Sequence, residues 1–162
     1  MTETTLVLLK PDALARGLSG RILARLEDAG LKIVGARMAQ IDDALARDHY
    51  DDLEERIGTE AFAGVCRYMQ SGPVIALAIQ GCDAVPVVRK LIGATFPSQA
   101  APGTIRGDLC HHGARTVDGQ AQTIYNLVHA SGSPEEAERE VALWFGPDEL
   151  FAYARLDEGL TF

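Results

Sequence analysis

The chain has 162 residues, of which 47% are hydrophobic and 23% charged, a composition typical of a globular protein with one core. Its formal net charge of −8, from 15 basic and 23 acidic residues, opposes contact with nucleic-acid backbones and anionic lipid, so we expect neither as a partner. No apolar run approaches the roughly 18 residues of a membrane span.

The ends of the chain and its cysteines bear on location. Residues 1–5 contain neither a basic region nor a cleavage site, so no export signal is predicted. Three widely spaced cysteines, Cys66, Cys82 and Cys110, are typical of reduced thiols rather than of a disulfide framework. We therefore expect a cytoplasmic protein.

The first half of the chain predicts alternating strands and helices from its apolar periodicity. The expected elements are a strand over 4–9, a helix over 19–29, a strand over 31–41, a helix from Asp42 or Asp43 to about Glu55, and a further helix from about Thr59. Gly30 is a typical C-terminal stop for the first of these helices.

The second half begins with a near-continuous apolar strand over 74–80, which favours a central place in the sheet. The remaining expected elements are a helix over 85–92 capped by Asp83, a long loop over 94–122, a strand over 123–128, a helix over 134–145 and a short helix around 148–153. Ser133 is predicted as the N-cap of the 134–145 helix, with Pro134 first and Glu136 placed for a capping box.

This order of elements predicts an α+β sandwich in the split βαβ arrangement. One four-stranded antiparallel sheet would carry helices on one face. No internal repeat or break in composition divides the sequence, so we expect a single domain over 1–162 with a longer loop at about 109–123. A structureless loop of that length in a compact domain is usually functional.

His129 is the leading candidate for chemistry. It lies between a predicted strand and a predicted helix start, and the small residues Ala130, Ser131 and Gly132 leave room for a ligand. Histidine titrates near neutrality and can act as nucleophile or general base, and the coming helix N-terminus favours an anion. A structural histidine that only hydrogen-bonds a neighbour explains the position equally well.

Basic residues near the ends of predicted strands and helices form a second group of candidate site residues. Lys10, Arg89 and Arg106 are each consistent with a solvated surface charge, but if they converge they form a clamp for polyphosphate. Neither a P-loop nor a Gly-x-Gly-x-x-Gly motif is present. Adjacent ligands at 110–112 with no second cluster of zinc spacing do not predict a metal site.

Taken together, these motifs resemble the nucleoside diphosphate kinase family over nearly the whole chain. The resemblance is carried by Lys10-Pro11-Asp12, Arg16-Gly17-Leu18, His49-Tyr50, Tyr68-Met69-Gln70-Ser71-Gly72-Pro73-Val74, Arg89 with Leu91, Gly93 and Thr95, Pro102-Gly103-Thr104-Ile105-Arg106-Gly107-Asp108, Asn126-Leu127-Val128-His129-Ala130-Ser131, Glu140 and Trp144-Phe145.

The resemblance implies a ferredoxin-like core, a homo-oligomer (hexamer or tetramer), and ping-pong transfer of a γ-phosphate between nucleoside tri- and diphosphates. His129 would be the phosphorylated nucleophile, and Glu140 would orient its imidazole. The nucleotide-binding residues implied are Lys10, Tyr50, Phe62, Arg89, Thr95, Arg106 and Asn126, with Lys10 also catalytic. Mg²⁺ would bind together with the nucleotide and have few or no protein ligands.

One spacing and three departures qualify the resemblance. A regular strand would put Asn126 and His129 on opposite faces, so both can line one site only if the strand twists or bulges. The segment 57–62 is longer than is usual in the family, and Ala61 stands where the base-stacking aromatic residue is expected. The segment 110–125 is also longer than usual. Gly132 replaces the usual acidic residue after Ser131. The alternative function is a ferredoxin-like regulatory module that binds nucleotide with little turnover.

Overall fold

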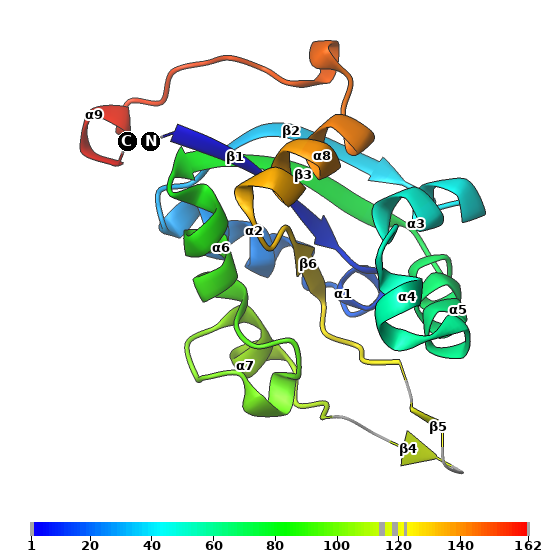
Figure 1. Cartoon of the computed structure of the whole chain (residues 1–162). Coiled ribbons are helices and arrows are strands. Elements are labelled where there is room, and N and C mark those ends of the chain that lie inside the picture. Colours follow the sequence, from blue (N-terminus) through cyan, green and yellow to red (C-terminus); the bar gives the residue numbers. More distant parts are fainter. Residues whose placement is uncertain (1, 114–115, 118–119, 122, 162) are drawn as a thin grey trace.

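A four-stranded antiparallel sheet forms the centre of the computed structural model, which describes residues 2–113, 116–117, 120–121 and 123–161 (Figure 1). Its order is β2 (Lys32–Ala39), β3 (Val74–Cys82), β1 (Thr2–Leu9) and β6 (Val128–Ala130). β1 pairs with β3 along its whole length, and Leu8 is opposite His129 in β6. The predicted central place of β3 is confirmed, and so is the ferredoxin-like α+β class.

Helices cover both faces of this sheet, so the expectation of helices on one face was too narrow. α2 (Ser19–Asp28) and α6 (Ala84–Ile92) pack against Val7 and Leu9 of β1, whereas α8 (Pro134–Trp144) packs against Leu6 and Leu8 on the opposite face. Successive side chains of a strand point to opposite faces. A strand that is apolar at every position therefore needs cover on both sides.

The remaining elements are short except for α5, which has 11 residues. They are α1 (Pro11–Ala15), α3 (Asp43–His49), α4 (Leu53–Ile57), α5 (Thr59–Met69), α7 (Ile105–Leu109), α9 (Glu158–Thr161), the 3₁₀ helices η1 (Pro97–Gln99) and η2 (Pro147–Glu149), and the hairpin of β4 (Thr116–Val117) and β5 (Gln120–Ala121). None of the helices in the described ranges is long and apolar enough to cross a membrane.

Three sequence predictions differ from the structure in these regions. The helix expected from 42 or 43 to 55 is two helices, α3 and α4, separated by a turn at 50–52. The loop expected over 94–122 contains η1, α7 and the β4–β5 hairpin; its residues 114–115, 118–119 and 122 lie outside the described residues. In place of the helix expected around 148–153, η2 is followed by a segment along β2, where the Phe151 N–H donates to the Val34 carbonyl at 2.8 Å.

The strand that carries His129 is also shifted. The prediction of a strand over 123–128 was wrong, because β6 begins only at Val128. Leu127 has a positive φ of 69°, and the Val128 N–H donates to the Asn126 carbonyl at 2.8 Å, which is the pattern of a γ-turn. This turn breaks the strand alternation and lets Asn126 and His129 line one cavity.

The start of α8 follows the predicted capping chemistry with one change. The Ser133 hydroxyl accepts from the Glu136 N–H at 3.2 Å, and Pro134 is the first helical residue, as predicted. The Glu136 carboxylate, however, accepts from the N–H of Gly132 at 2.7 Å rather than from that of Ser133. The loop after His129 is therefore tied to the first turn of α8.

Candidate active site

A cavity of about 420 Å³ opens where β1, β6 and α8 meet α3, α5 and α6. Of the residues predicted for the site, those that line it are Lys10, Tyr50, Arg89, Thr95, Arg106, Asn126, His129 and Glu140. Lys10, Arg89 and Arg106 therefore converge on one cavity and are not scattered over the surface.

A larger hollow of about 600 Å³ lies between α8, α6 and the start of β1, away from these residues. Its wall is mostly apolar, and its charged members, Glu3 and Glu138, are acidic. A phosphate would be repelled there, so the chemistry belongs to the smaller, cationic cavity.

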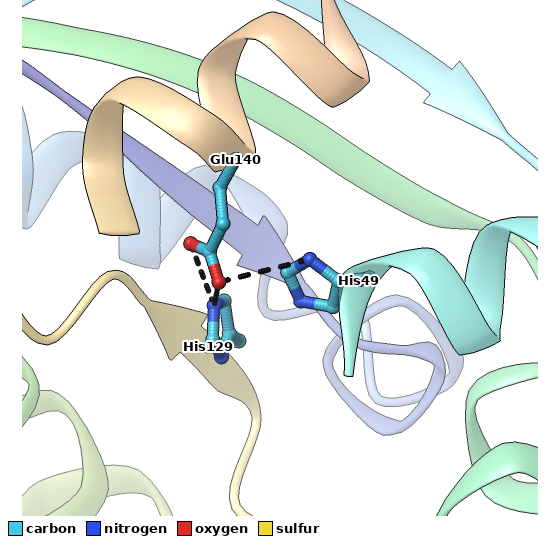
Figure 2. A group of neighbouring side chains, drawn as sticks. All are labelled: His49, His129 and Glu140. Atoms are coloured by element: carbon cyan, nitrogen blue, oxygen red, sulfur yellow. Dashed lines mark hydrogen bonds and ion pairs between the residues drawn. The ribbon is translucent and has the colours of Figure 1, made fainter. Parts of the chain in front are cut away.

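His129 is held by a buried carboxylate (Figure 2). Its Nε2 lies 3.0 and 3.1 Å from the two carboxylate oxygens of Glu140, and the Ser131 hydroxyl donates to the same carboxylate at 2.6 Å. Burial by itself raises the pKa of Glu140, but the hydrogen bond and charge of His129 outweigh it and the net pKa is lowered. An ionised carboxylate only accepts, so Nε2 carries a proton, and in the neutral imidazole the lone pair is then on Nδ1.

The second ring nitrogen of His129 points away from Glu140 in Figure 2. The side chain is 20% exposed although Glu140 is only 3% exposed. The nitrogen with the lone pair is thus the part of the pair that a ligand can approach.

His49 packs beside His129 and was not predicted as a site residue. Its Nδ1 accepts from the Trp144 indole N–H at 3.3 Å, and its ring meets that of His129 edge-on with centroids 4.5 Å apart. Burial, followed by the charge of His129, lowers the pKa of His49 to about 3, so it is neutral near pH 7. Its position directly before Tyr50 in the His49-Tyr50 motif was the available sequence signal.

Lys10 connects β1 to the turn before His129. Its ammonium donates to Asn126 Oδ1 at 2.8 Å, and the Asn126 amide donates to the Thr95 carbonyl at 2.9 Å. Burial, followed by the nearby charge of Arg106, lowers the pKa of Lys10 to about 7. An incoming anion would restore the protonated form, because an opposite charge raises the pKa of an amine.

Arg106 holds the backbone around the histidine. It donates to the carbonyls of Asn126 at 3.2 Å, Val128 at 2.7 Å and Gly93 at 2.9 Å, and it is 4% exposed. Burial and then the charge of Arg89 lower the pKa of Arg106 to about 10, which leaves it charged at neutral pH. Arg89 is exposed and donates to the Ala130 carbonyl at 3.3 Å, so its guanidinium is the more accessible of the two.

Phe62 is the one predicted site residue that the structure does not bring to the cavity. It is 4% exposed and lies beneath the guanidinium of Arg47, whose central carbon is 5.7 Å from the ring centroid. Its burial on α5 is consistent with a packing role in the apolar stripe of that helix. A base-stacking role for Phe62 gains no support from this position.

The cavity offers little to a metal ion on its own. His49, His129 and Glu140 have ligand atoms within 4.8 Å of one another, but the nearby cations Lys10 and Arg139 oppose a further positive charge. Mg²⁺ prefers oxygen ligands in octahedral geometry. Besides Glu140, the carboxylates that line the cavity are Asp52, which accepts from Arg56 at 3.1 Å, and Glu136, held by Gly132. Phosphate oxygens would therefore have to supply most ligands.

The fold and cavity together define an α+β domain in which a cationic cavity lies beside a histidine whose orientation is fixed by a carboxylate. A match to the family described as Nucleoside diphosphate kinase covers residues 3–150. The chain belongs to the nucleoside diphosphate kinase family, as its resemblance predicted.

Individual relatives agree with this assignment. The chain is 48% identical over 153 residues to a nucleoside diphosphate kinase of Pyrococcus furiosus, covering 94% of this chain and 89% of the relative. Among solved structures it is similar to a transition-state mimic of the Borrelia burgdorferi enzyme with bound vanadate and ADP, with a TM-score of 0.91, 39% identity and 97% and 95% of the two chains covered. It is also similar to the Halobacterium salinarum enzyme in complex with CDP, with a TM-score of 0.85, 41% identity and 98% and 97% covered.

Proposed function

We propose that the chain transfers the γ-phosphate of a nucleoside triphosphate to a nucleoside diphosphate by a ping-pong reaction through a phosphohistidine at His129. The observation that carries the proposal is the contact of Glu140 with Nε2 of His129, which leaves the Nδ1 lone pair available in a cationic cavity. Nδ1 attacks the γ-phosphorus, the bond to the β–γ bridging oxygen breaks, and the diphosphate leaves. A terminal phosphate oxygen of a second diphosphate then attacks the phosphorus and regenerates the imidazole.

The chain's own residues supply orientation and charge for both steps. The Nε2 proton stays on the ring, and the Glu140 carboxylate stabilises the positive charge that the imidazole gains during attack. Ser131 fixes the carboxylate through its 2.6 Å bond. Phosphoryl transfer requires mostly positioning and electrostatic stabilisation, and Lys10 and Arg89 would supply these to the phosphates.

The remaining site residues would hold the rest of the nucleotide. Thr95 and Asn126 would bind phosphate or sugar oxygens, Arg106 would keep the turn in place, and Tyr50 would form the wall beside His129. Because Phe62 lies outside the cavity, the nucleotide base would contact the aliphatic part of the cavity wall. Leu53, Val65 and Ile124 form that part. Aliphatic contacts do not read hydrogen-bond patterns, so this site would accept purines and pyrimidines.

Mg²⁺ would enter bound to the nucleotide, and when bound it would neutralise charge on the phosphates. We further propose a homo-oligomer, hexameric or tetrameric, acting in the cytoplasm. A mass from light scattering tests the subunit number: a monomer would contradict this part of the proposal.

The proposal is tested by labelling the protein with [γ-³²P]ATP and Mg²⁺ and removing free nucleotide. We expect an acid-labile, base-stable label that ADP, GDP, CDP and UDP each discharge as the triphosphate. His129→Ala should lose labelling, while the matched control His111→Ala, an exposed histidine outside the cavity, should keep it. ADP binding without label or exchange in the wild-type protein would favour a regulatory module instead.

A further inference from the structure

The backbone turn that carries His129 has an unusual central residue. Leu127 adopts φ = 69°, a region that L-residues other than Asn and Asp rarely occupy, while its side chain is fully buried in the core under α6. The turn is needed because it brings Asn126 and His129 to the same cavity. Since the leucine does not favour this conformation itself, its surroundings must hold it.

Three groups hold the backbone of this turn. Arg106 donates to the carbonyls on either side of Leu127, and the backbone N–H of Lys10 donates to the Leu127 carbonyl at 2.8 Å. The third group is Asp12, whose Oδ2 accepts from the Leu127 N–H at 3.1 Å. Of the three, Asp12 provides the contact to the N–H of the strained residue.

Asp12 is itself held in position. It lies in the first turn of α1, behind Lys10, and its Oδ1 accepts from the Tyr68 hydroxyl at 2.5 Å. Burial, and after it the charge of Asp12, raises the pKa of Tyr68, so the phenol stays protonated and keeps donating. One carboxylate thus joins α1, α5 and the turn before β6.

We propose that Asp12 is a positioning residue for the phosphoryl transfer. Through its bond to the Leu127 N–H it fixes the turn that sets the imidazole of His129 relative to the phosphate-binding side chains. The inference rests on the proposed role of His129 as the nucleophile. Asp12 acts on the backbone from outside the cavity wall and has no role as a ligand of the nucleotide.

The inference predicts a difference between two substitutions of the same residue. Asp12→Ala removes the acceptor, whereas Asp12→Asn keeps a carbonyl oxygen for Leu127 and turns its amide toward the Tyr68 oxygen. Small misplacements of a reacting group cost on the order of 10²-fold in rate. We therefore expect Asp12→Ala to phosphorylate His129 roughly 30- to 100-fold more slowly at saturating ATP, and Asp12→Asn to stay within about threefold of wild type.

Two further readouts separate positioning from general damage. ADP affinity should change by about threefold or less in Asp12→Ala, because Lys10 and Arg89 remain. Hydrogen–deuterium exchange of a peptide containing Leu127 should accelerate in Asp12→Ala and not in Asp12→Asn. Asp28→Ala, an exposed acidic residue at the end of α2, is the matched control and should behave as wild type.

The inference is overturned if Asp12→Ala phosphorylates as fast as Asp28→Ala, or if its Leu127 peptide exchanges at the wild-type rate. It is also overturned if Asp12→Asn is as slow as Asp12→Ala, because the charge and not the hydrogen bond would then matter. Failure of wild-type protein to form phosphohistidine at residue 129 would instead contradict the proposed function, which keeps the two results distinguishable.

Discussion

Glu140 contacts Nε2 of His129 through both carboxylate oxygens, at 3.0 and 3.1 Å, although it lies on a different element of the fold. Only residues 131–133 separate β6 from α8, and Trp144 on the same helix is 1% exposed in the core. The packing of α8 on the sheet therefore sets the orientation of the imidazole. The pair depends on tertiary structure as much as on local sequence.

Replacement of Glu140 by Gln tests the electrostatic part of this contact. The amide oxygen can still accept from Nε2, so the ring keeps its orientation, but the negative charge that stabilises the imidazolium is lost. We expect the rate of His129 phosphorylation in rapid-quench experiments to fall about 10- to 1,000-fold, with ADP affinity nearly unchanged. An equal rate in the variant would show that the charge does not contribute.

Nucleotide binding should be coupled to proton uptake by Lys10. Because its pKa is lowered to about 7 in the nucleotide-free protein, the amine is mostly neutral at pH 8, and bound phosphate raises its pKa. Calorimetry of ADP binding at pH 8, in buffers of different ionisation enthalpy, should show nearly one proton taken up.

The control for this experiment is Lys10→Met, which should lose that uptake while protons exchanged by the nucleotide itself remain. Affinity for ADP in the wild-type protein should also weaken as the pH rises above 7. The same proton count in both proteins would contradict a lowered pKa for Lys10.

His49 should make the fold sensitive to acid. Its folded pKa is lowered to about 3 from an ordinary 6.5, so between these values the unfolded chain binds more protons than the folded chain. The free energy of unfolding therefore decreases as the pH falls through this window. Denaturant titrations between pH 6.5 and 4.5, at fixed protein concentration, should show a steeper loss for wild type than for His49→Gln. Parallel slopes would indicate that His49 titrates normally.

Arg106 and Arg89 should behave differently although both are cavity arginines. Lysine cannot replace the three carbonyl contacts of Arg106, so Arg106→Lys should lower the free energy of unfolding by about 3 kcal/mol. Arg89→Lys should leave stability within about 0.5 kcal/mol, because Arg89 is exposed. Chemical denaturation measures the free energy of unfolding of both variants. An equal loss of this free energy in the two would mean that Arg106 does not hold the turn.

The strands β1 and β3 and the start of α8 were predictable because their signals are local. Leu6 to Leu9 and Val74 to Ile79 are almost continuously apolar, and Ser133 with Pro134 is a strong helix-start pattern. The break between α3 and α4 was not predictable, since 50–52 contains neither glycine nor proline. The signal for helices on the second face is that β1 carries apolar residues on both of its sides, Val7 and Leu9 on one and Leu6 and Leu8 on the other.

Most of the predicted site residues were brought together, but the means of doing so was hidden from the sequence. The spacing of Asn126 and His129 predicts that the strand is broken somewhere between them. It does not predict the γ-turn at Leu127, because leucine gives no signal for a positive φ. Residues 123–125 have high β-propensity, yet the turn delays the strand to Val128. Phe62 belongs to the apolar stripe of α5 and is buried, and this burial depends on tertiary packing that the sequence does not show.

The identity of the phosphorylated nitrogen tests most directly whether Glu140 directs the phosphate to the other nitrogen of His129. Protein labelled with ¹⁵N-histidine can be phosphorylated with ATP and Mg²⁺, and ¹H–¹⁵N spectra distinguish the two phosphohistidine isomers. We expect phosphate on Nδ1 of His129, with Nε2 protonated and hydrogen-bonded to Glu140. Phosphate on Nε2, on another histidine or on Ser131 would contradict this expectation.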